Sequence, residues 1–253
     1  MIPVLVPEWP APVGVRAAFS LRSGGTSGSP WESLNVGAHV GDSPASVRVN
    51  RQRLVSALEL PAEPIWLEQV HGTAVYTALE GDCGVDVGGV RPTADAAVTR
   101  AEDVVLAIQV ADCLPVLLCS ADGSVLGAAH AGWRGLAAGV LEATVEAMQT
   151  EPERLLAWFG PCIGPAHFEV GEEVREAFLR AGDSAAAFTP NPRGRWQCDL
   201  PALARRRLER LGVRSIHGGE HCTVADPVRF FSHRRDRQTG RMVALLWRSS
   251  VRI

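Results

Sequence analysis

Two kinds of hydrophobic pattern follow one another along the chain. Between residues 65 and 130, short runs rich in β-branched and other apolar residues are separated by turn residues, which is typical of strands. We therefore expect a largely antiparallel sheet in this part of the chain. The predicted strands are Ile65–Val70, Ala74–Leu79, Ala96–Val98, Val104–Val110, Pro115–Cys119 and Val125–His130.

After residue 130 the apolar positions change to helical spacing. Apolar side chains recur at helical intervals from Leu136 to Met148, which predicts an amphipathic helix there. Capping residues, prolines and glycines place the other elements. The further predicted helices are Asp42 or Ser43 to Leu60, Glu172–Arg180 closed by Gly182, and Asp199–Leu211 closed by Gly212. The further predicted strands are Leu155–Phe159, Val213–Ile216 and Met242–Trp247.

The order of these elements predicts the fold class. Strands and helices are mixed without regular β-α-β alternation, and no linker separates two parts of the chain. We therefore expect a single α+β domain over residues 1–253, with a mixed, largely antiparallel and sandwich-like sheet core flanked by helices. The Gly-, Ser- and Pro-rich segment 23–30 is expected to form a shaped loop.

The charged residues narrow the partners and the chemistry. With 25 basic and 28 acidic residues the formal net charge is −3, which gives no electrostatic signature of a protein that binds nucleic acid or an anionic membrane. All 25 basic residues are arginine, and the chain contains no lysine. Schiff-base and P-loop lysine chemistry are therefore excluded. Anions must be held by arginine side chains and backbone N–H groups.

The N-terminal segment and the cysteines bear on location. Residues 1–14 contain four prolines and no positive leader, so we expect no signal peptide. The most apolar stretch, Val104–Cys119, is interrupted by Gln109 and Asp112, so we expect no membrane span. Six cysteines without a C-x-x-C pair are expected to remain thiols. We predict a cytoplasmic monomer.

The residues that suggest chemistry lie around a predicted hairpin. Asp122-Gly123 between two apolar runs predicts a two-residue turn, which sets His130 opposite Pro115. Cys113 then lies on the same face, about 7–8 Å away at the backbone. A zinc ion, at about 2.3 Å from sulfur and about 2.0–2.1 Å from imidazole nitrogen, could bridge Cys113 and His130. A slip of one residue would place them on opposite faces.

A catalytic zinc site has three protein ligands and one open position. His71 follows a predicted strand and precedes Gly72, as a third ligand beside a strand end would. The residue pattern alone does not choose it over the other histidines. These are His39, His167, His217, His221 and His233.

Candidate anion-binding residues follow His130. In the segment 130–135, the glycines allow a close backbone approach, and Arg134 and the free N–H groups of the helix start suit phosphate or carboxylate. Arg22 and Arg51 are assigned to phosphate or ribose on the same chemical grounds. Glu169 is a candidate catalytic acid, and Cys162 is expected to be structural.

Eight short motifs are distributed over nearly the whole chain: Ser23-Gly-Gly-Thr-Ser, Ser33-Leu-Asn35, Gln69-Val-His-Gly72, Ala111-Asp-Cys113, His130-Ala-Gly-Trp-Arg-Gly135, Gly160-Pro-Cys-Ile-Gly164, Phe230-Phe-Ser-His-Arg-Arg-Asp236 and Gly240-Arg-Met242. They occur in the order found in the YfiH/YlmD family, which the chain resembles over nearly its whole length. This family, earlier labelled a multicopper polyphenol oxidase or laccase domain, is described as purine nucleoside phosphorylases. One departure is His233, where the family usually has tyrosine.

The resemblance implies an α+β sandwich with zinc held by His71, Cys113 and His130. It also implies phosphorolysis of adenosine, inosine, guanosine and methylthioadenosine, with adenosine deamination as a companion activity. Asn35 matches a motif position and is expected to contact the substrate. Cys113, His130 and Glu169 are the expected catalytic residues, and purine nucleosides and phosphate the expected partners.

Copper is ranked below zinc on residue chemistry. A copper cluster needs many imidazoles, usually in H-x-H pairs, whereas this chain has seven histidines and no such pair. A blue-copper site wants an axial ligand such as methionine, and none of the three methionines lies near the candidate ligands in sequence.

Three other hypotheses stay open. One is a metal-free cysteine hydrolase or deamidase with Cys113 as nucleophile and His130 as base. The others are a copper-dependent polyphenol oxidase and a non-catalytic zinc or purine sensor.

Overall fold

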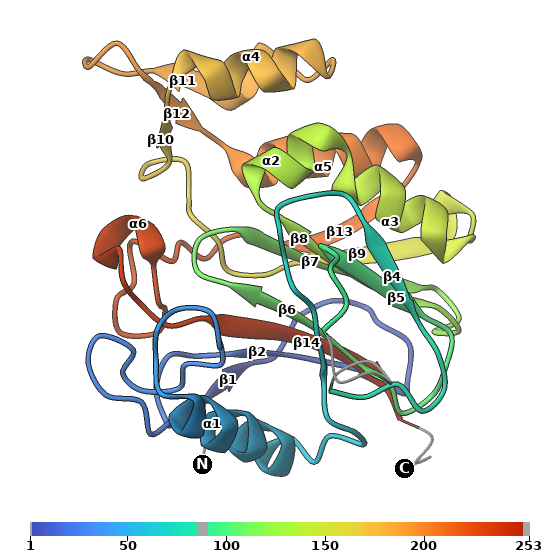
Figure 1. The fold of residues 1–253 in the computed structure, drawn as a ribbon. Helices are drawn as coiled ribbons and strands as arrows, with labels where there is room; N and C mark the ends of the chain where they lie inside the picture. The colour runs from blue at the N-terminus through green and yellow to red at the C-terminus, as the bar shows by residue number, and fades with distance from the viewer. Residues whose placement is uncertain (1, 85–90, 250–253) are drawn as a thin grey trace.

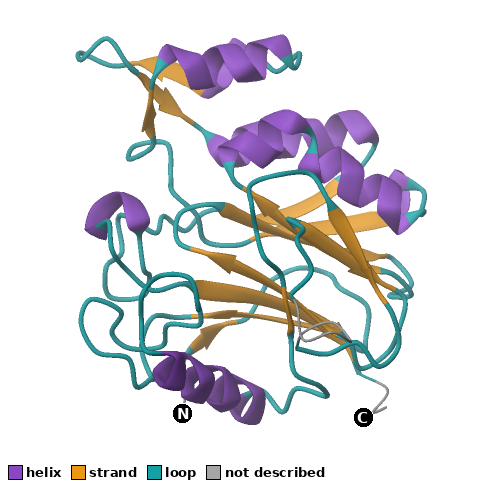
Figure 2. Cartoon of the chain, viewed as in Figure 1, coloured by secondary structure: helices purple, strands orange, loops and turns teal. Residues whose placement is uncertain are grey.

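The computed structural model describes residues 2–84 and 91–249, and it arranges them in layers (Figure 1). A helix covers one face of a five-stranded sheet, a six-stranded sheet packs on the other face, and further helices cover the outer side of the second sheet. A small three-stranded sheet with one helix extends from one end (Figure 2). The helices are α1 (Pro44–Ala57), α2 (Trp133–Ala138), α3 (Val140–Met148), α4 (Glu172–Arg180), α5 (Leu200–Leu211) and α6 (His233–Asp236), with 3-10 turns at Pro152–Arg154 and Ala185–Ala187.

The five-stranded sheet has the order β1-β2-β14-β6-β3. Its strands are β1 (Val4–Leu5), β2 (Val15–Ser20), β14 (Met242–Arg248), β6 (Val105–Val110) and β3 (Ile65–Trp66).

The six-stranded sheet has the order β13-β9-β7-β8-β5-β4. Its strands are β13 (Ser215–Gly218), β9 (Leu155–Phe159), β7 (Leu114–Ser120), β8 (Leu126–Ala131), β5 (Ala96–Thr99) and β4 (Val75–Ala78). The small sheet consists of β10 (Glu169–Val170), β12 (Trp196–Cys198) and β11 (Phe188–Pro190). Among the described strands, β13–β9, β3–β6 and β4–β5 pair in parallel and the other pairs are antiparallel.

Three apolar clusters fill the spaces between these layers. Ile108 of β6 and Leu117 of β7 belong to the cluster between the two large sheets. Leu141 of α3 belongs to the cluster beneath the outer helices, and Leu54 of α1 packs with Trp66 on the opposite side of the molecule. Both faces of the central strands are therefore buried, which is why those strands read as continuous apolar runs. The predicted single-domain α+β fold with a mixed, largely antiparallel sandwich is confirmed.

Local sequence features predicted the bounds of several helices and strands correctly. The predicted strand Leu155–Phe159 and the predicted helix Glu172–Arg180 have the bounds of β9 and α4. Helix α1 begins after Ser43 with proline in its first turn, and the Asp199 side chain caps α5 by accepting from the Ala202 N–H. Proline near a helix start and a capping carboxylate act through their nearest neighbours in the chain, so they can be recognised without tertiary information.

Other predictions were wrong in extent. The single helix expected over Leu136–Met148 is two helices, because Gly139 adopts a left-handed φ of 103° between α2 and α3. The strand expected over Ile65–Val70 is only two residues long, and the strand expected over Val213–Ile216 lies two residues later in the chain. Strand β2, α6 and the small sheet were not predicted.

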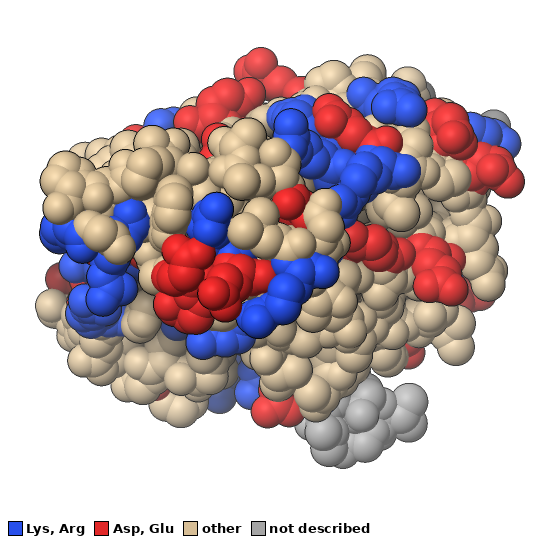
Figure 3. All heavy atoms as spheres, turned by 90° about the horizontal axis from the view of Figure 1, so that it is seen from above, with Lys and Arg blue, Asp and Glu red and all other residues tan. Residues whose placement is uncertain are grey.

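The surface and the helices add two observations about partners. Figure 3 shows arginine and acidic side chains interspersed over the face seen from above. Within residues 2–84 and 91–249, every helix is too short or too polar to traverse a lipid bilayer.

Candidate metal centre

The hairpin between β7 and β8 places the first candidate ligand. In the structure Pro115 pairs with His130 and Cys119 with Leu126, which is the register predicted from the Asp-Gly turn. Leu126 and Ala128 point into the cluster between the two large sheets. His130 lies on the same face of β8 because side chains alternate along a strand. His130 as a whole residue is only 4% exposed.

Cys113 precedes β7 and packs against the same cluster, as the hairpin prediction required. The residue before it, Asp112, holds this segment in place with a positive φ of 95°, which is strained for a residue other than glycine. Its carboxylate accepts hydrogen bonds from the Thr223 hydroxyl at 2.5 Å and the Arg234 N–H at 2.6 Å. Its carbonyl oxygen accepts from the Ile163 N–H at 2.8 Å.

His71 enters from the other large sheet. It follows the short strand β3, adopts a left-handed φ of 61°, and is exposed to solvent. Its Nε2 atom lies 3.8 Å from the Cys113 sulfur, and its ring lies edge-on to that of His130 with the centroids 4.8 Å apart. The structure therefore brings together three side chains that are far apart in the chain.

These three residues form a metal-binding group. One ligand atom each from His71, Cys113 and His130 lies within 4.8 Å of the other two. Within the described ranges no fourth His, Cys, Asp or Glu joins them. Three protein ligands, with burial at His130 and exposure at His71, are typical of a catalytic site that keeps one position for water or substrate.

Asp95 orients this group from behind. Its fully buried carboxylate lies 2.8 Å from His130 Nδ1. It also accepts backbone hydrogen bonds from Val70, His71 and Gly72 at 3.1, 2.8 and 2.6 Å. Because a carboxylate only accepts, His130 Nδ1 carries the hydrogen and Nε2 is left for a metal ion. One side chain thus positions two ligands.

The ligands interact electrostatically. Burial opposes the charged form of the Cys113 thiol, but the positive charge of His130 and contacts with both histidines lower its pKa to about 6. Burial also opposes the His130 imidazolium, but the Cys113 thiolate and Asp95 raise its pKa to about 9. The metal-free group is therefore a thiolate–imidazolium pair at neutral pH.

This pair predicts how zinc affinity depends on pH. Binding needs a thiolate and a neutral His130, so between pH 6 and pH 9 one proton must leave His130 for each ion bound. We expect the affinity to rise about tenfold per pH unit across this window and to level off above it. Below pH 6 the thiol proton must leave too, which steepens the slope. Competition with a chromophoric chelator, corrected for the chelator's own protonation, measures this, and a flat profile would contradict it.

Gly132 allows the ligands to approach one another. A Cβ atom at this position would lie 2.9 Å from the Cys113 sulfur and 3.0 Å from His71 Cδ2. Its φ of −65° and ψ of 156° suit any residue, so the requirement for glycine is steric.

Gly132→Ala should therefore displace the ligands without straining the backbone. We expect zinc affinity to fall roughly tenfold, in the range found when the support of a metal ligand is removed. Gly28→Ala is the matched control, because a Cβ there would meet nothing within 4 Å. Equal zinc affinities of the two variants would show that the close approach is unimportant.

A small pocket opens beside Cys113. Its volume is about 130 Å³, on the scale of the roughly 150 Å³ cavity that accommodates a single aromatic ring in another protein. Its apolar walls are Trp133, Phe168, Ile163 and Leu200, and its polar lining includes Asp112, His233 and Arg234. The pocket thus combines aromatic walls and a few polar groups next to the metal-binding group, as expected of a small-molecule site.

Two polar residues of this pocket have defined orientations. His233 Nδ1 lies 2.5 Å from the Arg237 carbonyl oxygen, so it donates and Nε2 is the nitrogen available to a ligand. The Arg234 guanidinium lies over the Phe168 ring at 5.3 Å and donates to the Glu169 carbonyl oxygen at 2.9 Å.

Positive charges act on His39, and Arg241 carries one of them. Burial, and after it the charges of Arg241, Arg91, Arg51 and His130, together lower the pKa of His39 to about 4. Burial lowers the pKa of Arg241 as well, while the charges of Cys113 and Asp112 oppose this shift. The segment around His39 is therefore strongly electropositive, which favours an anionic ligand.

The structure separates the predicted anion-binding arginines. Arg51 stacks on Trp66 at 3.8 Å and donates to the Val36 carbonyl oxygen, but it also contributes to the electropositive region around His39. Arg134 is exposed and stacks at 4.4 Å on Trp133, a wall of the pocket. Arg22 donates to the carbonyl oxygens of two loops.

Asn35 and Glu169 have partners inside the protein. Asn35 is fully buried, and its amide bonds Gly37, Asp42 and the Arg241 N–H. The Glu169 carboxylate accepts a hydrogen bond from the Asn191 side chain at 2.8 Å and forms an ion pair with Arg193 at 2.5 Å, both in the connection between β11 and β12. Glu169 does not line the pocket beside Cys113 among the residues that the structure describes. Asn35 thus supports the segment that carries Arg241.

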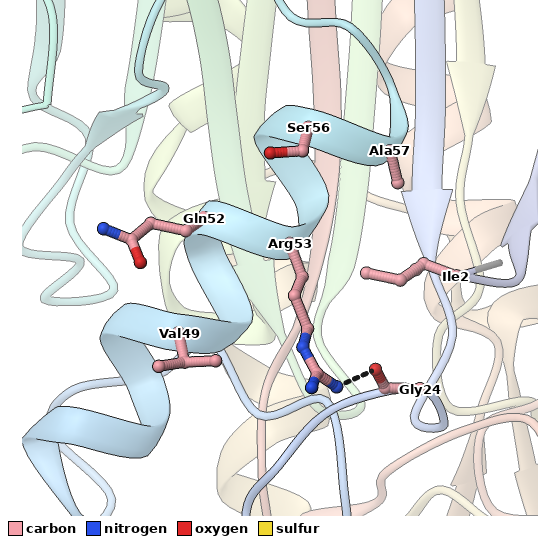
Figure 4. A pocket seen from close by; sticks show the side chains of 7 residues that line it. All are labelled: Ile2, Gly24, Val49, Gln52, Arg53, Ser56 and Ala57. Carbon is pink, nitrogen blue, oxygen red and sulfur yellow. Dashed lines mark hydrogen bonds between the residues drawn. The ribbon is translucent and has the colours of Figure 1, made fainter.

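A larger hollow, of about 490 Å³, lies elsewhere on the surface (Figure 4). It lies against α1, where Arg53 donates to the Gly24 carbonyl oxygen at 3.0 Å. The other residues drawn there are apolar or uncharged. Among the described residues, its lining contains no histidine, cysteine or carboxylate, so size alone does not locate the active site.

Sequence reasoning missed three residues of the site: Asp95, Asp112 and Arg241. Asp112 and Arg241 stand inside the quoted motifs, and that position was the available signal. Asp95 is an acidic residue between apolar residues at a strand start, and such a residue is buried only when it has hydrogen-bond partners.

The chain is similar to known proteins over nearly its whole length. The family model described as multi-copper polyphenol oxidoreductase laccase matches residues 16–249. The chain is 48% identical over 247 residues to the Escherichia coli protein named purine nucleoside phosphorylase YfiH, covering 98% of this chain and 99% of the relative. A purine nucleoside phosphorylase of Xylella fastidiosa is 51% identical over 257 residues, covering 96% of each chain. A crystal structure of a Neisseria meningitidis protein superposes with a TM-score of 0.91 at 44% identity, covering 98% of this chain and 99% of that one.

Proposed function

The chain belongs to the family described as multi-copper polyphenol oxidoreductase laccase, within which it is similar to YfiH, and we propose that it is a zinc-dependent purine nucleoside phosphorylase. The observation that carries the proposal is the convergence of His71, Cys113 and His130 beside a pocket with aromatic walls. The names of the similar proteins point to the same class of substrate. A nucleoside and inorganic phosphate are the proposed substrates.

Zinc fits the donor atoms better than copper. A thiolate with two imidazoles is a common zinc donor set, and the hydrogen bond from His130 to Asp95 is typical of the support that zinc-binding histidines receive. Met148 and Met242, the described methionines, are both fully buried in apolar clusters, which does not favour an axial copper ligand. When bound, zinc would supply Lewis acidity beside the substrate.

The pocket beside Cys113 is the proposed site of the purine base. Trp133 and Phe168 offer flat apolar surfaces to the base, and Nε2 of His233 offers one polar contact. The Arg234 N–H and side chain are engaged with Asp112 and Glu169, so Arg234 stabilises the wall of the pocket.

The electropositive region is the proposed site of phosphate. The charges of Arg51, Arg91 and Arg241 act on His39, and Arg134 stacks on Trp133, a wall of the pocket. Guanidinium groups suit phosphate because they donate in pairs. With phosphate on this side and the base on the other, the ribose carbon that is attacked would lie between them, and holding both reactants there is the main catalytic contribution. The predictions that Arg22 and Asn35 contact the substrates and that Glu169 is a catalytic acid stay part of this proposal.

An assay of the zinc-loaded protein tests this function. Inosine with phosphate should yield hypoxanthine and ribose 1-phosphate, and omission of phosphate should stop the release of base. A preparation of Cys113→Ser purified in the same way controls for contaminating phosphorylase. The proposal would be refuted if neither free base nor ribose 1-phosphate formed from adenosine, inosine, guanosine or methylthioadenosine.

Adenosine deamination is the second proposed activity. The same zinc-loaded protein, given adenosine without phosphate, should form inosine and ammonia. Deamination needs no phosphate. Failure to form inosine would therefore contradict the deaminase activity but not the phosphorolysis.

One observation also favours a metal-free cysteine hydrolase. The thiolate–imidazolium pair of Cys113 and His130 is the arrangement that such an enzyme uses. The two hypotheses differ at His71, which a metal site requires and a Cys–His dyad does not. Two experiments separate them: the His71→Ala variant and chelation of the wild-type protein. Loss of activity in both experiments supports the metal-dependent enzyme, and retention of activity in both supports the Cys–His dyad.

A further inference from the structure

A second thiol–imidazole cluster lies outside the metal-binding group. Cys162 belongs to the loop after β9, Cys222 precedes Thr223, and His167 follows a few residues after Cys162. All six cysteines are free thiols in the structure. None of these three residues serves the function proposed above.

Cys162 and Cys222 lie side by side on adjacent segments. They form a parallel β-bridge, in which the Cys162 N–H donates to the His221 carbonyl oxygen at 3.2 Å. The Thr223 N–H donates to the Cys162 carbonyl oxygen at 2.9 Å. Paired residues in adjacent strands are about 4.7–4.9 Å apart with side chains on the same face, and a disulfide requires Cα atoms about 4.4–6.8 Å apart. The backbone thus permits a bond between the two sulfurs.

The two thiols have different surroundings. Cys222 is partly exposed, and its sulfur lies 3.5 Å from Nδ1 of the exposed His167. The Gly164 N–H donates to the same sulfur at 3.2 Å, which stabilises negative charge there. Cys162 is 1% exposed, and its thiol donates to the Ile163 carbonyl oxygen at 3.6 Å. Cys222 is therefore placed to react with a small solute, and Cys162 is placed to attack the modified Cys222 sulfur afterwards.

We propose that Cys222 and Cys162 form a hydroperoxide-reactive pair that closes to a disulfide. His167 accepts the Cys222 proton, and the sulfur attacks the peroxide, so that the O–O bond breaks, a sulfenic acid forms and water leaves with that proton. The Cys162 sulfur then attacks the sulfenic sulfur, the S–S bond forms, and a second water leaves with the Cys162 proton. One peroxide is reduced for each pair of thiols oxidised.

The disulfide would affect the metal-binding group indirectly, through the hydrogen bonds to Asp112. Ile163 follows Cys162 and donates to the Asp112 carbonyl oxygen, and Thr223 follows Cys222 and donates to the Asp112 carboxylate. Drawing the two sulfurs together moves both donors, and with them the strained residue that precedes Cys113. We expect the oxidised protein to release zinc to a chelator faster than the reduced protein.

Peptide mapping of zinc-loaded protein after hydrogen peroxide treatment tests the pair. The expected result is a Cys162–Cys222 crosslink that dithiothreitol reverses. In Cys162→Ser, sulfenic acid should accumulate on Cys222, where a dimedone-type reagent traps it. His167→Gln removes the proton acceptor and should slow oxidation about tenfold or more. Cys83→Ser, which changes an exposed thiol elsewhere, should oxidise like the wild type.

Two results would overturn the proposal. Oxidation that spares Cys222, or a Cys222 sulfenic acid that persists with Cys162 present, would show that the two sulfurs do not act as a pair. Zinc release is compared with that from Cys222→Ser after the same treatment, which accounts for direct oxidation of Cys113. Equal rates would refute the link to the metal-binding group. Because mass and metal release are measured, the result is independent of phosphorylase activity.

Discussion

Cys113→Ser is expected to lose bound zinc and to lower kcat/KM by about a thousandfold or more. A serine hydroxyl is a poor zinc ligand at neutral pH, whereas the thiolate is already formed there because the pKa of Cys113 is lowered to about 6. His71 and His130 alone would leave two protein ligands, one fewer than zinc sites commonly have. Elemental analysis of both proteins beside the phosphorolysis assay measures the two losses.

The matched control is Cys83→Ser, which changes an exposed thiol away from the site and should keep both zinc and activity. Zinc bound in Cys113→Ser at the wild-type ratio would show that the thiolate is no ligand. Lost activity with zinc retained would instead identify Cys113 as a nucleophile, as in the cysteine hydrolase hypothesis.

Asp95→Asn is expected to lower zinc affinity by about 10- to 100-fold, the range for residues that orient metal ligands. The single amide oxygen of asparagine cannot accept from His130 and from three backbone N–H groups at once. The amide NH₂ would then face donors, so His71 and His130 would both lose their orientation. Activity at saturating zinc should recover in part, since the ligands themselves remain.

Asp122→Asn is the matched control, because Asp122 also accepts several hydrogen bonds but lies exposed in the turn at the far end of the same hairpin. Asparagine before glycine suits this turn, so the fold should be kept. Thermal unfolding of both variants without zinc separates a folding defect from a ligand defect. Unchanged zinc affinity in a folded Asp95→Asn protein would contradict the positioning role.

Much of the secondary structure was predictable because it depends on near neighbours in the chain. The Asp122-Gly123 turn alone set the register that brings Cys113 and His130 to one face. Similarly, the Asp199 cap marked the start of α5. Turns and caps contribute their energy within a few residues, so the same residues produce them in many folds.

The elements that were not predicted depend on contacts between segments that are distant in the chain. Strand β2 was missed, since it is held by β14 more than 200 residues later. The break at Gly139 was also missed, since an isolated glycine within an apolar helical pattern is compatible with either outcome.

The chain alone therefore determined the hairpin, and with it two of the three ligands. The residue pattern alone did not choose His71 over the other histidines, although the family resemblance implied it. Only the packing of the two large sheets brings His71 beside Cys113 and places Asp95 behind it. His71 lies 42 residues from Cys113, and its left-handed backbone is held by a carboxylate at the start of a strand in the other sheet. Such contacts carry no local pattern, because their energy arises only after the chain has closed large loops.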